Sequence, residues 1–90
     1  MAKLKVYHWL DMTSVKWEEC PWVRQVDCIV AAKSKAEVAR LMGEKYTHNL
    51  FNLSETWNDK DIALAMSKPG TIFWRHDGDH VTGEWKEGKP

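Results

Sequence analysis

Two stretches in the first third of the chain have the residue pattern of a β-strand, in which the side chains of the two faces alternate along the chain. Lys3–Leu10 is the first of these stretches and Val23–Ala32 is the second. Because successive side chains of a strand point to opposite faces, this alternation predicts two β-strands. They follow one another along the chain, and we expect them to pair antiparallel.

The connection between these strands, Asp11–Trp22, is too long for a tight hairpin turn. It carries apolar residues among polar ones, including Trp17 and Trp22. Connections of this length without structure of their own are uncommon, and those that occur are often functional. This segment is therefore a candidate contact surface.

Ser34–Gly43 has the pattern of a capped helix. Ser34 and Glu37 form a capping box, in which the serine hydroxyl accepts the Glu37 N–H and the glutamate side chain reaches back. Gly43 supplies the left-handed residue that ends such a helix. The sequence thus predicts one helix between these two residues.

The next segment, Glu44–Trp57, fits two interpretations. Some of its apolar residues have helical spacing, whereas the alternation near its end indicates a short strand. We predict a brief helical turn near Thr47–Asn52, followed by an extended segment. A second helix, capped by Asn58 or Asp59, then ends before Pro69.

The C-terminal part of the chain predicts a β-hairpin. Thr71–His76 is rich in strand formers, and Asp77-Gly78 is typical of a two-residue hairpin turn. Asp79–Trp85 would return antiparallel. The polar residues that follow, Lys86–Pro90, are expected to be a frayed tail.

These elements together predict a single α+β domain over residues 1–90. The expected order is β-β-α-(turn or strand)-α-β-β, which suggests a mostly antiparallel sheet with two helices on one face. A chain of this size buries only about 60–65% of its unfolded surface. Six tryptophans help to compensate, because each can bury ~150–250 Å².

Charge is balanced along the chain, with 13 Lys and Arg against 13 Asp and Glu. There is no basic arm or acidic tail, so composition gives no electrostatic argument for nucleic acid or an anionic membrane as partner. No apolar stretch approaches the ~18–20 residues of a membrane span, and no signal peptide is apparent. We expect a cytoplasmic protein in which Cys20 and Cys28 are reduced.

Sequence motifs of catalysis are absent: there is no Gly-rich phosphate loop, GxSxG, HExxH or CxxC. We therefore predict a protein that is not an enzyme and needs no cofactor. The one cluster with a metal-like composition is His76-Asp77-Gly78-Asp79-His80. Alternation sends neighbouring side chains of a strand to opposite faces, so these residues suit a hairpin tip better than a metal site.

The tryptophans fall into two groups. Trp9 and Trp74, inside predicted strands, are most simply packing residues. Trp17 and Trp22 lie in the long connection, where they either cover the sheet or stand exposed. Because Trp and Arg dominate the hot spots of protein interfaces, Trp17, Trp22 and Arg24 form the predicted partner-binding surface. A homodimer through an open sheet edge is a further hypothesis.

The alternative hypothesis is a helix-turn-helix-like DNA-binding protein that uses residues 34–53. Ala39 and Gly43 match the small residue and the turn glycine of such a motif. The residues that would contact DNA are Thr47, His48, Asn49 and Asn52. The segment Tyr46–Leu53 has no Lys or Arg, and phosphate contacts supply most of the affinity for DNA, so this alternative ranks second.

Ser34–Arg75 resembles small accessory proteins of bacteriophages, particularly those that infect actinobacteria. The likeness rests on the capped Ser-Lys-Ala-Glu helix, the Ser-Glu-Thr segment Ser54–Thr56, and Pro69-Gly70 before an aromatic strand. These phage proteins have no assigned activity, so the resemblance transfers no functional residue. It implies an accessory protein in the host cytoplasm that binds and modulates a host protein.

Overall fold

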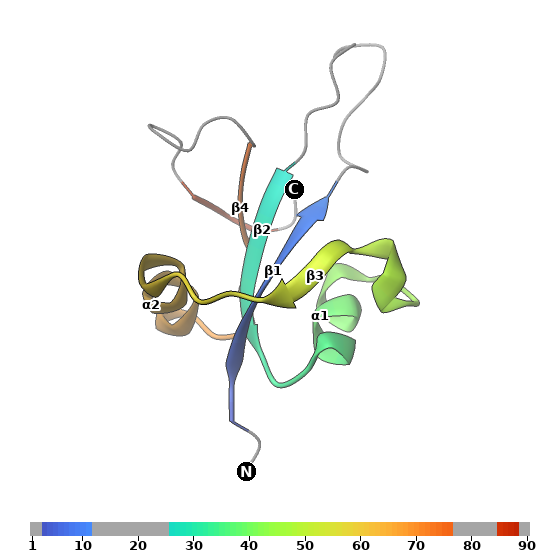
Figure 1. The fold of residues 1–90 in the computed structure, drawn as a ribbon, viewed down its shortest axis with the longest axis horizontal. Coiled ribbons are helices and arrows are strands. Elements are labelled where there is room, and N and C mark those ends of the chain that lie inside the picture. Colours follow the sequence, from blue (N-terminus) through green and yellow to red (C-terminus); the bar gives the residue numbers. More distant parts are fainter. Residues whose placement is uncertain (1–2, 12–25, 77–84, 89–90) are drawn as a thin grey trace.

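The computed structural model describes residues 3–11, 26–76 and 85–88. It contains five strands, two α-helices and one 3₁₀ helix (Figure 1). In chain order these are β1 (Lys5–Asp11), β2 (Val26–Ala32), α1 (Lys35–Met42), η1 (Thr47–Asn49), β3 (Phe51–Glu55), α2 (Asp59–Ser67), β4 (Phe73–His76) and β5 (Lys86–Glu87). The predicted α+β class and the predicted order of elements are confirmed.

The strands form one antiparallel sheet in the order β3-β1-β2-β4-β5. β1 and β2 pair over their full length, from Lys5 opposite Ala32 to Asp11 opposite Val26, which confirms the predicted pairing. Later strands add on either side, β3 beside β1 and β4 beside β2. The most apolar strand, β2, is thereby placed at the centre, where both of its faces can be covered.

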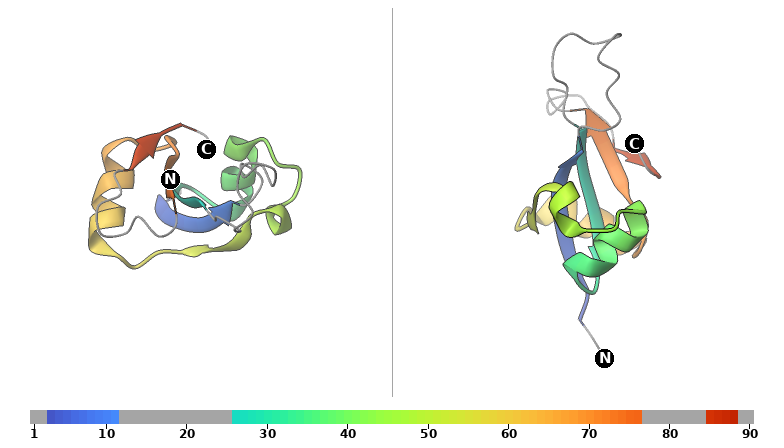
Figure 2. Two further views of the ribbon diagram at one scale, coloured as in Figure 1. Left: turned by 90° about the horizontal axis from the view of Figure 1, so that it is seen from above. Right: turned by 90° about the vertical axis from the view of Figure 1, so that its right-hand side faces the viewer.

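The two helices cover opposite faces of the sheet, and the prediction that they share one face is wrong (Figure 2). Val38 of α1 belongs to one core cluster with Cys28 and Val30, whereas Ala65 of α2 belongs to another with Ile29. The physical reason lies in β2, whose successive residues are apolar on both sides. Each face of this strand therefore needs its own cover, and the chain supplies one helix for each.

Helix α1 lies between Ser34 and Gly43 as predicted, and of the predicted capping box the structure shows the bond to the Ser34 hydroxyl. The Ser34 hydroxyl accepts a hydrogen bond from the Glu37 N–H at 3.2 Å, which satisfies one of the free donors of the first turn. Gly43 has a φ of 77°, and its N–H donates to the Arg40 carbonyl while the Glu44 N–H donates to Ala39. This pair of bonds is a Schellman motif, which needs the left-handed residue that glycine supplies.

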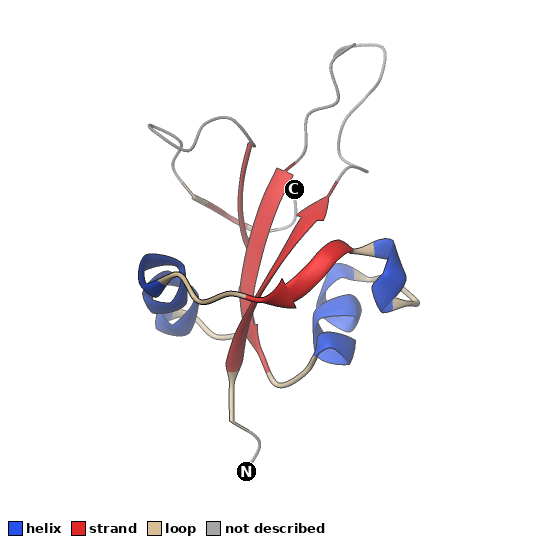
Figure 3. Ribbon diagram, viewed as in Figure 1, coloured by secondary structure: helices blue, strands red, loops and turns tan. Residues whose placement is uncertain are grey.

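Helix α2 is capped by Asn58 rather than by Asp59. The Asn58 side-chain oxygen accepts hydrogen bonds from the N–H groups of Lys60 and Asp61, at 3.0 and 3.1 Å. Asp59 and Asp61 lie in the first turn, where negative charge is favourable next to the helix dipole. Figure 3 shows the helices in blue. Among the described residues, none of them combines the length and the apolar composition that crossing a bilayer requires.

The segment between the helices is a turn followed by a strand, as predicted. η1 covers Thr47–Asn49, and β3 starts two residues later. The register between β1 and β3 shifts between His8 and Leu10, and Asn52 opposite this shift has a φ of 57°. This is a β-bulge, and asparagine is one of the few residues with a side chain that tolerates the left-handed conformation.

The packing roles predicted for the strand residues are confirmed. Trp9 and Cys28 are fully buried on the α1 face, and Trp74 packs against the edge of the same cluster. On the α2 face, Phe73 is buried and Trp85 packs beside its cluster. The large indoles thus fill the space between the sheet and both helices.

A short strand, β5, forms where the sequence predicted a frayed tail, and residues 79–84 of the predicted return strand lie outside the described residues. Lys86 and Glu87 form β5 opposite Trp74 and Phe73, so the expected frayed tail does not begin at Lys86. The Gly88 N–H also donates to the Ile72 carbonyl at 2.8 Å. The predicted hairpin turn at Asp77-Gly78 lies outside the described residues.

Candidate functional site

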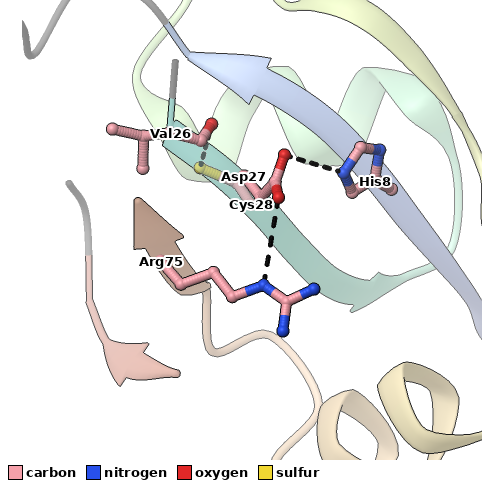
Figure 4. Close-up of polar contacts among 5 residues, drawn as sticks. All are labelled: His8, Val26, Asp27, Cys28 and Arg75. Carbon is pink, nitrogen blue, oxygen red and sulfur yellow. Dashed lines mark hydrogen bonds and ion pairs between the residues drawn. The ribbon is translucent and has the colours of Figure 1, made fainter. Parts of the chain in front are cut away.

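Three charged or polar side chains from three neighbouring strands meet on the α2 face of the sheet (Figure 4). Asp27 of β2 lies opposite Arg75 of β4, and His8 of β1 lies diagonally across from Asp27. Asp27 and Arg75 follow the row of Ile29 and Phe73 along the strands, whereas His8 lies opposite Ile29 in that row. We refer to His8, Asp27 and Arg75 as the sheet-face cluster.

The Asp27 carboxylate is shared between the two other members of the sheet-face cluster. One oxygen lies 3.4 Å from His8 Nε2, and the other lies 3.9 Å from Arg75 Nε. The Asp27 side chain is only 15% exposed. A carboxylate this far from water needs compensating charge, and the arginine on the next strand supplies it.

The guanidinium of Arg75 also packs over the ring of Trp85, with its central carbon 4.3 Å from the ring centroid. Cation–π contacts of this kind contribute about 0.5–2 kcal/mol, depending on desolvation. Arg75 Nε is nevertheless buried without a hydrogen-bond partner among the described residues. Arg75 is therefore held by the Asp27 charge and by stacking rather than by close hydrogen bonds.

A histidine oriented by a carboxylate is an arrangement that can move protons, because the carboxylate fixes the ring. Here the same carboxylate also pairs with Arg75, and all three side chains come from β-strands. The simplest role of the sheet-face cluster is to tie β1, β2 and β4 together across the sheet. Within the described part of the chain, no group of three His, Cys, Asp or Glu side chains could hold a metal ion.

Sequence reasoning did not single out the sheet-face cluster. The available signal was Asp27, the one charged residue in the otherwise apolar strand Val26–Ala32. A carboxylate in such a strand needs a partner, but strand order decides which residue that is. Arg75 is far from Asp27 in sequence and becomes its neighbour only because β4 pairs with β2.

The residues predicted to bind a partner, Trp17, Trp22 and Arg24, lie outside the described residues. The predicted hairpin-tip cluster does so as well, except for the backbone of His76 at the end of β4. Both hypotheses therefore stay predictions.

The helix-turn-helix geometry is not formed. Residues 34–43 do form the first helix with its caps, but the predicted recognition segment Tyr46–Leu53 contains only η1 and the start of β3. It pairs with β1 instead, because Phe51 lies opposite Leu10 and buried Leu50 joins the core on the α1 face. Where the helix-turn-helix alternative required a recognition helix, the chain forms a 3₁₀ turn followed by a strand.

The residues named for DNA contact nevertheless lie in one region of the surface. Thr47 and His48 are exposed in η1, Asn49 ends it, and Asn52 is exposed at the bulge of β3. The ring of His48 stacks on the ring of Tyr46, with centroids 5.1 Å apart and planes 15° apart. This stacked pair was not predicted, since spacing alone does not show that two side chains two residues apart will meet.

Two open hollows adjoin this stack, one lined by His48 and the other by Tyr46. One, of about 360 Å³, is lined by Lys35, Thr47, His48, Leu50, Asn52 and Leu53. The other, of about 410 Å³, is lined by Ala36, Ala39, Arg40, Glu44, Lys45, Tyr46 and Thr47. We call the stacked rings and these hollows the η1 platform.

A second exposed aromatic lies at the other end of β3. Trp57 is 80% exposed, more than any other large apolar side chain that the structure describes. It follows Thr56, whose N–H donates to the Val6 carbonyl at 2.9 Å and so continues the pairing with β1. Trp57 therefore stands where the edge of the sheet leads into the capped start of α2.

The fold and these surfaces define a small α+β domain with an open five-stranded antiparallel sheet. No protein-family model, curated protein or solved structure matched the chain.

Proposed function

We propose that this protein is a non-enzymatic binding protein that holds a partner protein through Trp57 and the adjoining edge of β3. The observation that carries the proposal is the exposure of Trp57, at 80% of its surface. Tryptophan is enriched in the hot spots of protein interfaces, where one side chain can contribute ≥ ~2 kcal/mol to binding. Among the described residues, we assign to Trp57 the partner contact that the sequence predicted for Trp17, Trp22 and Arg24.

The backbone next to Trp57 supports an extended segment as the part of the partner that binds. Among the strands that the structure describes, β3 lies at the edge of the sheet, with β1 on one side only. Since the Thr56 N–H points toward β1, the N–H and carbonyl of Glu55 point away from β1, toward solvent. A partner strand can bond to these groups and place an apolar side chain against the indole.

The bulge at Asn52 limits how far such a partner strand can extend. A bulge bends its strand and interrupts regular pairing, which protects an edge against indiscriminate association. The usable edge is thus the short stretch from Leu53 to Trp57. A short edge joined to one large indole favours a specific contact over aggregation.

The resemblance of Ser34–Arg75 to bacteriophage accessory proteins supports a host protein as the partner, met in the host cytoplasm. Trp17, Trp22 and Arg24 remain a second proposed contact surface on the same protein. The two surfaces make separate predictions, because substitutions can be made in each without the other.

The test is affinity capture from host lysate, followed by measurement of the dissociation constant with the purified captured protein. We expect Trp57→Ala to weaken binding at least tenfold without lowering the melting temperature, because the side chain is mostly in water. Glu55→Pro, which removes an outward N–H, should also weaken binding. Met66→Ala is the matched control, since Met66 is another exposed apolar residue on α2.

Three results would contradict this assignment. Unchanged affinity in Trp57→Ala excludes the indole as anchor. Loss of binding only in the Trp17→Ala, Trp22→Ala double variant moves the contact to the Asp11–Arg24 segment. If the protein forms a concentration-dependent dimer and Glu55→Pro makes it monomeric, the β3 edge pairs with a second copy of the chain.

A further inference from the structure

The η1 platform combines stacked aromatic rings with positive charge on an exposed surface. The Tyr46 and His48 rings lie nearly parallel, and Lys45 Nζ lies 5.3 Å from the centroid of the Tyr46 ring. Tyr46 is 51% exposed, and His48 is also exposed. These rings lie outside both core clusters, so packing of the fold does not account for them.

We infer that the η1 platform binds unpaired bases of single-stranded nucleic acid. Proteins that bind single strands combine aromatic rings, on which bases stack, with cations that follow the phosphates. The stack leaves one face of His48 uncovered by Tyr46, and His48 lines the hollow of about 360 Å³. A base can extend the Tyr46–His48 stack by one ring at that place.

Cations line both hollows of the η1 platform. Lys35 lines the hollow next to His48, and Arg40 and Lys45 line the hollow next to Tyr46. All three side chains are exposed, so they can reach phosphates that enter or leave the stacked base. Glu44 lines the second hollow as well, which makes the hollow beside His48 the better place for the base.

Asn52 gives this hollow a group that can recognise a base edge. Its amide is exposed and lines the same hollow as His48. The left-handed backbone of Asn52, with a φ of 57°, lies in the bulge that interrupts the pairing of β3 with β1. An amide offers both a donor and an acceptor, which is how asparagine pairs with adenine.

The balance of charge favours a single strand over a duplex. The chain has a formal net charge of zero, and only a few cations surround the platform, so phosphate contacts alone would bind weakly. The described part of residues 34–53 offers no second helix for a major groove. Stacking must therefore supply much of the affinity, and bases are free to stack only where they are unpaired. This inference is independent of the partner protein proposed for Trp57.

The test is fluorescence anisotropy with a labelled oligoadenylate of about 12 nucleotides, in RNA and DNA forms and at low salt. We expect His48→Ala and Tyr46→Ala each to weaken binding about tenfold, equivalent to about 1.4 kcal/mol. His48→Phe should retain binding, because it keeps a flat ring and removes only the ring nitrogens. Lys60→Ala, an exposed lysine of α2 on the opposite face of the sheet, is the matched control.

Salt dependence adds a second readout. Lys45→Ala should reduce the slope of log affinity against log salt by about 0.7, the value for one phosphate contact on a single strand. The aromatic substitutions should leave that slope unchanged. A matching reduction in Lys60→Ala would show general charge attraction and overturn the inference.

Three further outcomes would overturn the inference. If a duplex of the same sequence binds as tightly as the single strand, stacking of unpaired bases is excluded as the source of affinity. If adenosine monophosphate competes as well per nucleotide as the oligomer does, the platform is a mononucleotide site and not a site for a strand. The absence of any anisotropy change with either oligomer at low salt also disproves the assignment.

Discussion

Asp27 and Arg75 lie directly opposite each other on neighbouring antiparallel strands, with Asp27 Oδ2 3.9 Å from Arg75 Nε. They are far apart in sequence. They meet because the chain passes from β3 at one edge of the sheet through α2 to β4, which pairs with β2. The pair lies at the end of the apolar α2 face, next to Trp85. On that face, the pair lies at the boundary between the buried apolar residues and the polar ones.

The first prediction concerns this pair. We expect Asp27→Asn to lower the free energy of unfolding by about 1–3 kcal/mol, because it leaves a partly buried guanidinium without compensating charge. The measurement is chemical denaturation at neutral pH. Glu87→Gln, which alters the exposed ion pair between Glu87 and Lys68, should cost less than about 1 kcal/mol. Equal losses in both variants would mean that Asp27 behaves as a surface residue.

The second prediction concerns the bulge in β3. Asn52 has a φ of 57°, a conformation that glycine adopts freely and β-branched residues avoid. We expect Asn52→Gly to be neutral or slightly stabilising and Asn52→Val to be destabilised by about 1–3 kcal/mol. Thermal melts of the two variants check this. A valine variant as stable as the glycine variant would show that the strand pairs with β1 without the bulge.

The third prediction concerns the helix caps. Ser34→Ala and Asn58→Ala each remove a side-chain oxygen that accepts from the first turn. We expect each to lower the free energy of unfolding by about 0.5–2 kcal/mol. Asn58→Asp keeps the acceptor and should retain the stability that Asn58→Ala loses. If the aspartate variant is no more stable than the alanine variant, Asn58 does not act as a cap.

The fourth prediction tests the placement of the helices on opposite faces. Val38 and Ile62 belong to separate packing clusters with the sheet between them. The losses in Val38→Ala and Ile62→Ala should therefore add to within about 0.5 kcal/mol in the double variant, as expected for sites without shared contacts. Denaturant titrations of the four proteins measure this. A larger coupling would place the two helices in contact on one face.

Local features of this protein could be predicted well because they depend on neighbouring residues. The caps at Ser34 and Gly43 use hydrogen bonds between positions a few residues apart, so the motif itself specifies them. The alternation in Lys3–Leu10 and Val23–Ala32 likewise located β1 and β2 and their antiparallel pairing.

The faces and the sites depended on contacts between distant residues. Alternation showed that β2 is apolar on both sides, yet α1 and α2 were expected on one face, because no local signal says which face a helix will cover. The partners of Asp27 and the meeting of Tyr46 with His48 depended on strand order and on the path of one turn.

By itself, the sequence determined the two ends of α1 and the antiparallel pairing of β1 with β2, since capping and side-chain alternation act over a few residues. Only the tertiary structure decided which faces are covered, which charges pair, and that Trp57 stays exposed while Trp9 is buried. Both are indoles in or beside strands, and their difference comes from position in the sheet: β1 has neighbours on both sides, whereas β3 ends at an open edge.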